Sequence, residues 1–256
     1  MQKDKKKKEK EKVTLKEWIK DNAKALFWAI LIAFTVRSCT FEPFNIPSGS
    51  MIPTMLVGDY LFVNKFSYGY SRYSFPFGIP LVPGRVFYTQ PKRGDIIVFR
   101  LPTDTSVDYI KRVVGLPGDE IQVINGILHI NGKPVKRTFK KIVMEDRGGV
   151  PTPHSLYDEE LPEGLVHSIL EYSDSEPQDN TQKFIVPEDH FFMMGDNRDN
   201  SQDSRWLDKV GYIPKSLLVG KAQFIFYSNN GYAPFIFFWS WPKSIRWERI
   251  FKGVGP

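Results

Sequence analysis

Hydrophobic residues follow two different patterns along the 256-residue chain. Ala25 to Val36 is an uncharged, mostly apolar run between Lys24 and Arg37. From Asn45 onward, short apolar runs are broken by Gly, Pro and Asn, which is typical of strands joined by turns. The pattern predicts one N-terminal helix followed by a mainly β domain built from antiparallel sheets.

Individual strands are predicted where apolar residues alternate or cluster after a turn. The clearest are residues 59–65, 94–100 and 221–227. Residues 120–124 and 127–130 flank Asn125-Gly126, a pair that favours a two-residue hairpin turn. Residues 136–183 mix charge and Pro with few apolar runs, so we expect an inserted smaller subdomain there.

The net charge of +6 comes largely from a lysine tract within residues 3–12. Basic residues in a tail, rather than on a folded face with aromatics, argue against nucleic-acid binding. Lysines before an apolar segment mark the cytoplasmic side of a membrane. We therefore expect a basic cytoplasmic tail at 1–17, a transmembrane anchor at 18–42 and an extracytoplasmic β domain at 43–256.

The anchor prediction depends on more than the central apolar run, which is shorter than the roughly 20 residues that span a bilayer. Trp18 and Ile19 extend the apolar surface on one side, and Phe41 and Phe44 extend it on the other. Lys24 and Arg37 have stems long enough to reach the lipid headgroups. A cleavable signal peptide is the alternative, because small residues occupy positions 38–40.

The numbers and positions of cysteine and histidine argue against a disulfide-stabilised fold and against a metal site. Cys39 is the only cysteine, so an intrachain disulfide and zinc sites built on cysteine pairs are impossible. The histidines are scattered without ligand spacing, at positions 129, 154, 167 and 190. We expect no metal and no cofactor. The aromatic segment 235–242 suits either a membrane interface or a buried strand.

Two residues are candidates for nucleophilic chemistry. Ser50 lies in a small, turn-prone run just past the apolar segment, and Lys111 has Tyr109 and Ile110 beside it. Serine is a poor nucleophile until a base takes its proton. Lysine becomes such a base only when burial lowers its pKa. Taken alone, Lys111 reads as a solvated lysine at a strand edge.

Four segments resemble signature segments of bacterial type I signal peptidases, in the order of that family and behind an apolar segment. They are Pro47–Thr54, Pro91–Phe99, Asp108–Asp119 and Gly195–Arg205. The resemblance spans roughly residues 24–227. It implies a membrane-bound serine endopeptidase of the bacterial cytoplasmic membrane. Such an enzyme uses a Ser-Lys dyad to cleave signal peptides from exported preproteins after a small-x-small motif.

The resemblance also implies roles for single residues. Ser50 would be the nucleophile and Lys111 its base. The Ser48 hydroxyl and the Ser50 backbone N–H would stabilise the oxyanion. Ser201 would orient the Lys111 amine, while Asp203 would pair with Arg205 to support the site.

Substrate pockets are expected beside these segments, where apolar side chains adjoin the catalytic residues. The candidates are Phe44, Ile46, Met51, Tyr109 and Ile110. Shallow apolar pockets would accept alanine and exclude larger side chains. The expected partners are preproteins and membrane lipid.

Two other functions stay open at this level. A Ser-His-Asp hydrolase would use His190 as base with Asp199 or Asp203 as orienter, but the chain lacks a Gly-x-Ser-x-Gly elbow. A non-catalytic, membrane-anchored β module that binds secretory partners is the alternative from another class. A self-cleaving Ser-Lys repressor is disfavoured by the apolar segment and by the absence of a helical DNA-binding region.

Overall fold

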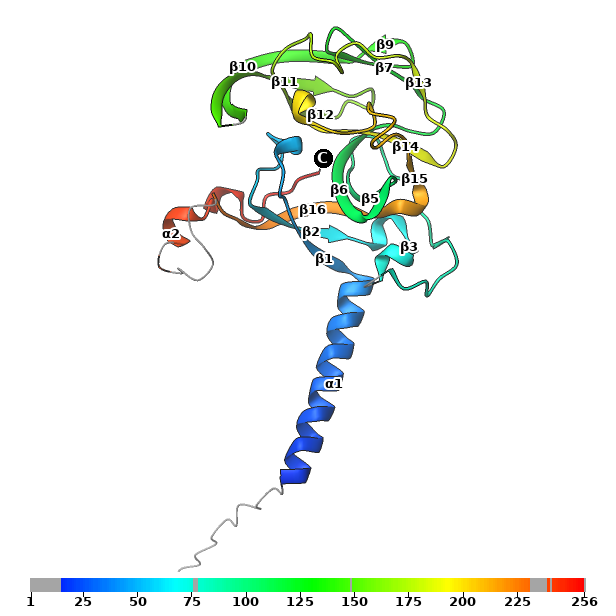
Figure 1. The fold of residues 1–256 in the computed structure, drawn as a ribbon, viewed down its shortest axis with the longest axis vertical. Coiled ribbons are helices and arrows are strands. Elements are labelled where there is room, and N and C mark those ends of the chain that lie inside the picture. Colours follow the sequence, from blue (N-terminus) through cyan, green and yellow to red (C-terminus); the bar gives the residue numbers. More distant parts are fainter. Residues whose placement is uncertain (1–14, 76–77, 148, 231–238, 240, 256) are drawn as a thin grey trace, which may run out of the picture.

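A long helix leads into a body of antiparallel β-sheets (Figure 1). This computed structural model describes residues 15–75, 78–147, 149–230, 239 and 241–255. All pairings between its strands are antiparallel. The predicted mainly β fold with antiparallel sheets is therefore confirmed.

The largest sheet has seven strands in the order β1-β2-β16-β5-β6-β14-β15. Their bounds are Phe41–Asn45 for β1, Asp59–Asn64 for β2, Leu218–Ser228 for β16, Ile96–Leu101 for β5, Asp104–Gly115 for β6, His190–Met194 for β14 and Ile213–Pro214 for β15. A two-stranded sheet of β3 (Tyr70–Ser71) and β4 (Arg85–Val86) lies apart from it in the topology.

The strands β6 and β14 pair directly, although residues 116–189 separate them in the sequence. Those residues form two further sheets, drawn above the main sheet in Figure 1. One contains β10 (Lys136–Arg147), β11 (Val150–Glu160) and β12 (Val166–Glu171), and the other contains β13 (Phe184–Ile185), β7 (Glu120–Ile124), β8 (Ile127–Ile130) and β9 (Lys133–Pro134). The segment outside the main sheet is thus wider than the predicted insertion at 136–183.

The hairpin of β7 and β8 shows how local sequence sets the fold. Asn125 and Gly126 both have positive φ, 49° and 72°. A two-residue turn of this kind matches the twist of the flanking strands, and Asn-Gly adopts it readily. The predicted hairpin is confirmed.

Two hydrophobic cores meet at β5, which is buried on both faces. Ile96 and Val98 belong to one core, whereas Ile97 and Phe99 belong to the other. Alternate residues of a strand point to opposite faces, so a strand between two cores is apolar throughout. The first core also contains Met51, on the turn that carries Ser50.

The N-terminal helix α1, Leu15–Cys39, extends away from the sheets (Figure 1). Trp18, Leu26 and Phe27 on it are each more than half exposed. Within the described part of the chain, no helix has both the length and the apolar character needed to cross a bilayer. The transmembrane span predicted at 18–42 is therefore not found. Lys20, Asp21 and Lys24 charge the first half of the helix and shorten its apolar stretch.

The chain end returns to the main sheet. Val254 is buried in the first core, and Arg249 donates hydrogen bonds to the buried carboxylate of Asp59 at 3.0 and 2.5 Å. A short helix α2, Trp241–Ser244, precedes this segment. Trp239 and Trp247 are exposed, whereas residues 235–238 of the predicted aromatic segment lie outside the described residues.

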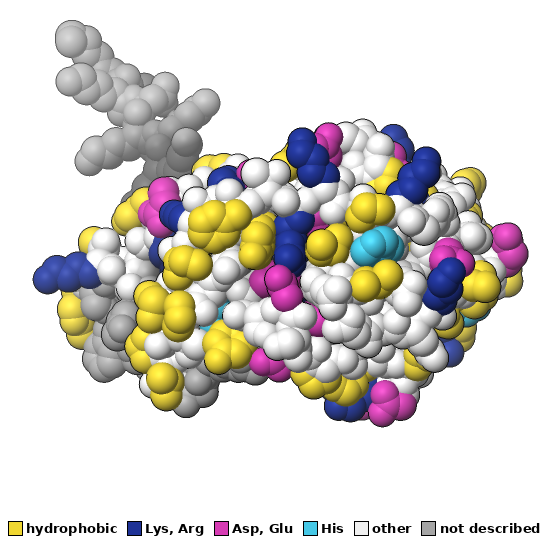
Figure 2. All heavy atoms as spheres, turned by 90° about the horizontal axis from the view of Figure 1, so that it is seen from above, with side chains coloured by type: hydrophobic (Ala, Val, Ile, Leu, Met, Phe, Trp, Pro, Cys, Tyr) yellow, Lys and Arg dark blue, Asp and Glu magenta, His cyan; other side chains and the backbone are white. Residues whose placement is uncertain are grey.

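Exposed hydrophobic side chains on the face seen from above occur in small groups among polar and charged ones (Figure 2). The hairpin of β10 and β11 exposes several, namely Phe139, Ile142, Met144 and Val150. Scattered apolar exposure of this kind is ordinary for a folded surface.

Candidate active site

Ser50 and Lys111 lie in direct contact. The Lys111 amine donates to Ser50 Oγ at 2.7 Å and to the backbone carbonyl of Ile110 at 3.0 Å. Ser50 is on the 3-10 turn η1, Gly49–Met51, and Lys111 is on β6. Both side chains are buried, with relative exposures of 7% and 4%. The structure thus brings together the two residues that sequence analysis paired.

Neighbouring segments hold the Ser50 turn in place. The backbone N–H of Asn197 donates to the Ser50 carbonyl at 3.1 Å. The Asn197 side-chain amide donates to the Gly49 carbonyl, also at 3.1 Å. On the other side, Met51 and Met55 are fully buried in the core. The hydrogen bonds from Asn197 and the packing of Met51 and Met55 therefore hold the Ser50 turn on two sides. A nucleophile held in one position in this way is preorganised for attack.

The surroundings of Lys111 change its acid-base chemistry. Burial lowers the pKa of its amine from 10.5 to about 8, because a charged group loses its hydration there. The carboxylates of Asp203 and Asp196 act in the opposite direction and limit the change. The Tyr109 ring covers the amine, with its centroid 5.1 Å away. A substantial share of Lys111 is therefore neutral near pH 8 and able to accept a proton.

Ser48 lies at the mouth of the same site. Its hydroxyl oxygen is 3.4 Å from Ser50 Oγ, and the residue is exposed. A hydroxyl at this position can donate to an oxygen atom that develops charge beside the nucleophile.

An open cleft of about 650 Å³ contains both Ser50 and Lys111. Four of the predicted pocket residues line it: Phe44, Ile46, Tyr109 and Ile110. The fifth, Met51, is a wrong prediction, since its side chain is fully buried in the core and supports the turn from behind. Adjacency in sequence could not separate the two faces of a three-residue turn.

The chain matches one family over most of its length. The family model described as "Signal peptidase, peptidase S26" matches residues 15–227. Signal peptidase I of Rickettsia canadensis is 39% identical over 265 residues, covering 95% of this chain and 94% of the relative. Signal peptidase I of Rickettsia typhi is 40% identical over 258 residues, covering 92% and 94%. The chain belongs to the S26 family of signal peptidases.

A solved signal peptidase I from Enterococcus faecalis shares 24% identity with this chain and covers 52% of it, and 97% of its own length, at a TM-score of 0.30. That superposition is too loose to carry an argument. Membership of the S26 family instead follows from the sequence matches, and it makes the chain a serine peptidase. This result contradicts the alternative of a non-catalytic binding module.

The third signature segment supports the site in this S26 peptidase. Arg205 donates to both carboxylate oxygens of Asp203 at 2.9 Å, as predicted. Asp203 also accepts the backbone N–H of Gly195 at 3.0 Å. Ser201 is buried near this pair, and the Arg205 guanidinium lowers the pKa of Asp203 against the effect of burial. The predicted hydrogen bond from Ser201 to Lys111 is not formed: the amine donates to Ser50 and to the Ile110 carbonyl, and Ser201 Oγ has no hydrogen-bond partner among the described residues.

Gly195 allows a close approach behind the nucleophile. A Cβ on this residue would lie 2.2 Å from Ser201 Oγ and 2.5 Å from the Ser50 carbonyl oxygen. Only a residue without a side chain fits there. The third signature segment therefore touches the Ser50 turn directly.

Sequence reasoning missed several residues of the cleft. Its wall also includes Asn45, Val98, Val107, Asn200, Gln202, Trp206 and Lys209. Gln202 accepts a hydrogen bond from the Tyr109 hydroxyl at 2.8 Å and so ties two sides of the cleft together. Asn200 and Gln202 lie within the third signature segment, which was a usable signal, whereas Val98 could only be found from strand pairing with Ile110.

A buried ion pair behind the site was also missed. Arg112 donates to Asp196 through two nitrogens at 2.8 and 2.7 Å, and Thr54 bonds to the same carboxylate. Arg112 follows Lys111 on β6, so its side chain points to the opposite face of the sheet. The pairing joins β6 to the third signature segment. His167 lies 3.9 Å from Asp196, and burial lowers its pKa to about 4.

The histidine-based alternative is contradicted by the geometry. His190 begins β14, and its ring contacts the carbonyl of Glu188 at 2.8 Å. Asp203 is committed to Arg205, and Asp199 accepts backbone N–H groups of the insertion. The contact to Ser50 Oγ comes from lysine. No Ser-His-Asp arrangement forms from these residues.

Proposed function

We propose that this S26 peptidase cleaves signal peptides from exported preproteins with Ser50 as nucleophile and Lys111 as general base. The observation that carries the proposal is the 2.7 Å contact between a buried lysine amine and Ser50 Oγ. A neutral amine at this distance can take the hydroxyl proton as oxygen attacks a carbonyl carbon.

The reaction then runs in two halves. Ser50 Oγ bonds to the scissile carbonyl carbon, and its proton moves to Lys111. The resulting ammonium gives that proton to the leaving amine as the peptide bond breaks, which leaves an acyl-enzyme. Lys111 next takes a proton from water, whose oxygen attacks the ester carbonyl carbon. The ammonium returns that proton to Ser50 Oγ as the ester bond breaks, which releases the carboxylic acid product and restores both residues. No atom outside the chain, the substrate and water is required.

The oxyanion that forms in each half requires donors. We assign this role to the Ser48 hydroxyl, 3.4 Å from Ser50 Oγ, together with the Ser50 backbone N–H. One such donor contributes about 3 kcal/mol to lowering the barrier in other serine peptidases. Ser201 and the Asp203–Arg205 pair position the segment around the amine.

The cleft supports selection of small side chains. Phe44, Ile46 and Ile110 contribute apolar side chains to the cleft that contains Ser50. Shallow apolar subsites within this cleft would accept alanine and exclude larger side chains, which would give cleavage after a small-x-small motif. The names of the relatives, Signal peptidase I, support the same substrate class.

We further propose that α1 brings the enzyme to membrane lipid. Leu26, Phe27, Ile30 and Ile32 are each about 60% exposed, which is unusual for an apolar group in contact with water only. Replacing Leu26 and Ile30 by Asp should reduce binding to phosphatidylglycerol vesicles, whereas Ile185→Asp, at an exposed position of β13, should not. Equal binding of both variants would contradict this part. The predicted cytoplasmic tail at 1–17 and inner-membrane location stay predictions.

The decisive experiment replaces Lys111 by Ala and follows preprotein cleavage. We expect a loss of at least about 10⁴-fold, as for the removal of a general base in related dyads and triads. Lys209→Ala is the matched control, since Lys209 lines the same cleft but is exposed and its amine lies over the Trp206 ring. Full activity of Lys111→Ala would refute the mechanism. Labelling of Ser50 by an acylating inhibitor provides an independent readout.

A further inference from the structure

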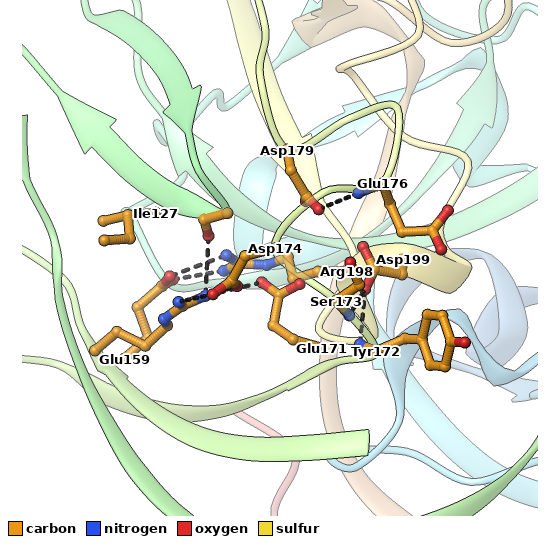
Figure 3. A network of polar contacts seen from close by, with 12 residues as sticks. Ile127, Glu159, Glu171, Tyr172, Ser173, Asp174, Glu176, Asp179, Arg198 and Asp199 are labelled. Carbon is orange, nitrogen blue, oxygen red and sulfur yellow. Dashed lines mark hydrogen bonds and ion pairs between the residues drawn. The ribbon is translucent and has the colours of Figure 1, made fainter. Parts of the chain in front are cut away.

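Three carboxylates converge between the insertion and the third signature segment. Glu171 is the last residue of β12, Asp179 lies in the loop that follows, and Asp199 is on the 3-10 turn η5, Arg198–Asn200. Their side chains face one another in Figure 3. One oxygen from each lies within 4.8 Å of the oxygens from the other two.

Each carboxylate uses one oxygen for the protein and leaves the other without a partner. Asp199 Oδ2 accepts two backbone N–H groups at 2.7 and 3.0 Å, and Asp179 Oδ2 accepts that of Glu176 at 2.6 Å. Glu171 Oε1 lies 3.7 Å from Arg137. The second oxygens, Glu171 Oε2, Asp179 Oδ1 and Asp199 Oδ1, are buried and have no hydrogen-bond partner among the described residues.

Two of the three residues are almost completely buried, whereas Asp199 is half-buried. Glu171 is 2% exposed and Asp179 is 1% exposed. Buried carboxylate oxygens are almost always hydrogen-bonded or bound to a cation, because an ion loses its hydration on burial. A buried water can donate to two such oxygens, but it carries no charge and leaves their repulsion in place.

Nearby arginines supply only part of the missing charge, since each has a closer acidic partner than Glu171. The pairs are Arg198 with Glu159 at 2.9 and 2.5 Å, Arg137 with Asp174 at 3.0 and 3.1 Å, and Arg205 with Asp203 at 2.9 Å. The carboxylates also disfavour ionisation of one another. Burial and the Asp199 charge raise the pKa of Asp179 to about 6 and contribute to raising that of Glu171 well above its usual value.

We propose that Glu171, Asp179 and Asp199 bind a divalent cation, with Ca²⁺ as the best match. The centre of a triangle with 4.8 Å sides lies about 2.8 Å from each corner, and Ca²⁺–oxygen distances are about 2.3–2.6 Å. A contraction of a few tenths of an ångström therefore brings three carboxylate oxygens to Ca²⁺ distance, and water would supply the remaining ligands of its six- to eight-fold coordination. Mg²⁺ requires shorter distances in a strict octahedron, and Zn²⁺ prefers nitrogen and sulfur ligands.

Such an ion would tie the insertion to the active-site cleft. Asp199, Asn200 and Ser201 all line that cleft. The ion would therefore hold one wall of the cleft against the loop after β12. Its role is structural, because the Ser50–Lys111 contact lies on another segment. This inference is independent of the proposed proteolytic mechanism.

Calcium binding can be measured directly on the full chain. After removal of divalent cations with a chelator, equilibrium dialysis against ⁴⁵Ca²⁺ should give one ion per chain. A hundredfold excess over Kd should raise Tm by roughly 5 °C. Glu171→Gln and Asp199→Asn should lose both effects. Asp208→Asn, which removes an exposed carboxylate that is not part of the cluster, should retain both.

Two results would overturn the proposal. One is the absence of Ca²⁺ binding to the parent protein at about 10 mM, above the range of weak protein sites. The other is binding that survives in Glu171→Gln or disappears in Asp208→Asn. Dialysis of the parent protein decides the first question even where a variant does not fold. If Tm rises on acidification but does not respond to Ca²⁺, the carboxylates are neutralised by protons that they share, and no cation is bound.

Discussion

The buried amine of Lys111 should make the enzyme less stable than a variant without it. Burial lowers its pKa from 10.5 to about 8, so between these values the folded protein binds fewer protons than the unfolded chain. Stability therefore rises with pH through this window and is lowest below pH 8. At about 1.4 kcal/mol for each pKa unit, the cost below pH 8 is roughly 3 kcal/mol.

Replacing Lys111 by Met removes the charge and keeps an unbranched side chain of similar length. The lost hydrogen bonds to Ser50 and to the Ile110 carbonyl offset about 1 kcal/mol of the gain. We expect Lys111→Met to be about 2 kcal/mol more stable than the parent at pH 7, while cleavage is abolished. The advantage should fade as pH rises toward 10.5.

Urea unfolding at pH 7, 9 and about 10.5 measures this difference. The matched control is Lys209→Met, which removes an exposed lysine from the same cleft and should change stability by less than about 0.5 kcal/mol. A Lys111→Met variant that is less stable than the parent at pH 7 would refute the predicted stability cost of the buried amine. A difference between them that does not depend on pH would refute it as well.

Three further outcomes follow from the site. The value of kcat/KM should rise about tenfold between pH 7 and pH 9 with an apparent pKa near 8, as the Lys111 amine loses its proton. Gly195→Ala should lower preprotein cleavage roughly a hundredfold, because its Cβ would press on the carbonyl of Ser50 2.5 Å away. Arg112→Met should cost about 3 kcal/mol or more in urea unfolding, because it leaves the buried Asp196 unpaired.

Each of these outcomes has a control. Lys209→Ala should keep the rise of kcat/KM with pH. A rise with an apparent pKa near 6.5 would instead indicate that a histidine is the base. Gly253→Ala should be nearly silent, because the nearest atom to its Cβ is 3.9 Å away. Lys136→Met breaks an exposed pair with Glu160 and should cost less than about 0.5 kcal/mol. A similar cost for Arg112→Met and Lys136→Met would contradict the role of the buried pair.

Local sequence signals predicted the parts of the fold that local physics decides. The Asn125-Gly126 turn required positive φ at both positions, and strand 59–65 alternated because one face meets the core. The long strands β10 and β11 were missed for a physical reason. Much of this hairpin is exposed, so its charged and apolar residues do not follow the period of two that burial imposes.

The candidate site shows the same limit. Ser50 and Lys111 were found because their segments resemble a family, whereas their 2.7 Å separation depends on the pairing of strands. Met51 was misplaced because the turn direction is a tertiary property. The carboxylates of Glu171, Asp179 and Asp199 come from three segments far apart in sequence, so no spacing rule could have gathered them.

The connection between α1 and β1 is short and held by several contacts, so it fixes the distance between the helix and the main sheet. Only Thr40 separates the two elements, and its carbonyl accepts the N–H of Lys65 at 3.0 Å. β1 pairs with β2 along its whole length, and Glu42 contacts the buried Lys65 amine at 2.7 Å. The five residues of β1 therefore form a stiff arm of about 17 Å. An enzyme held at a surface by α1 would work at one fixed height above it, which selects substrates by position as well as by side chain.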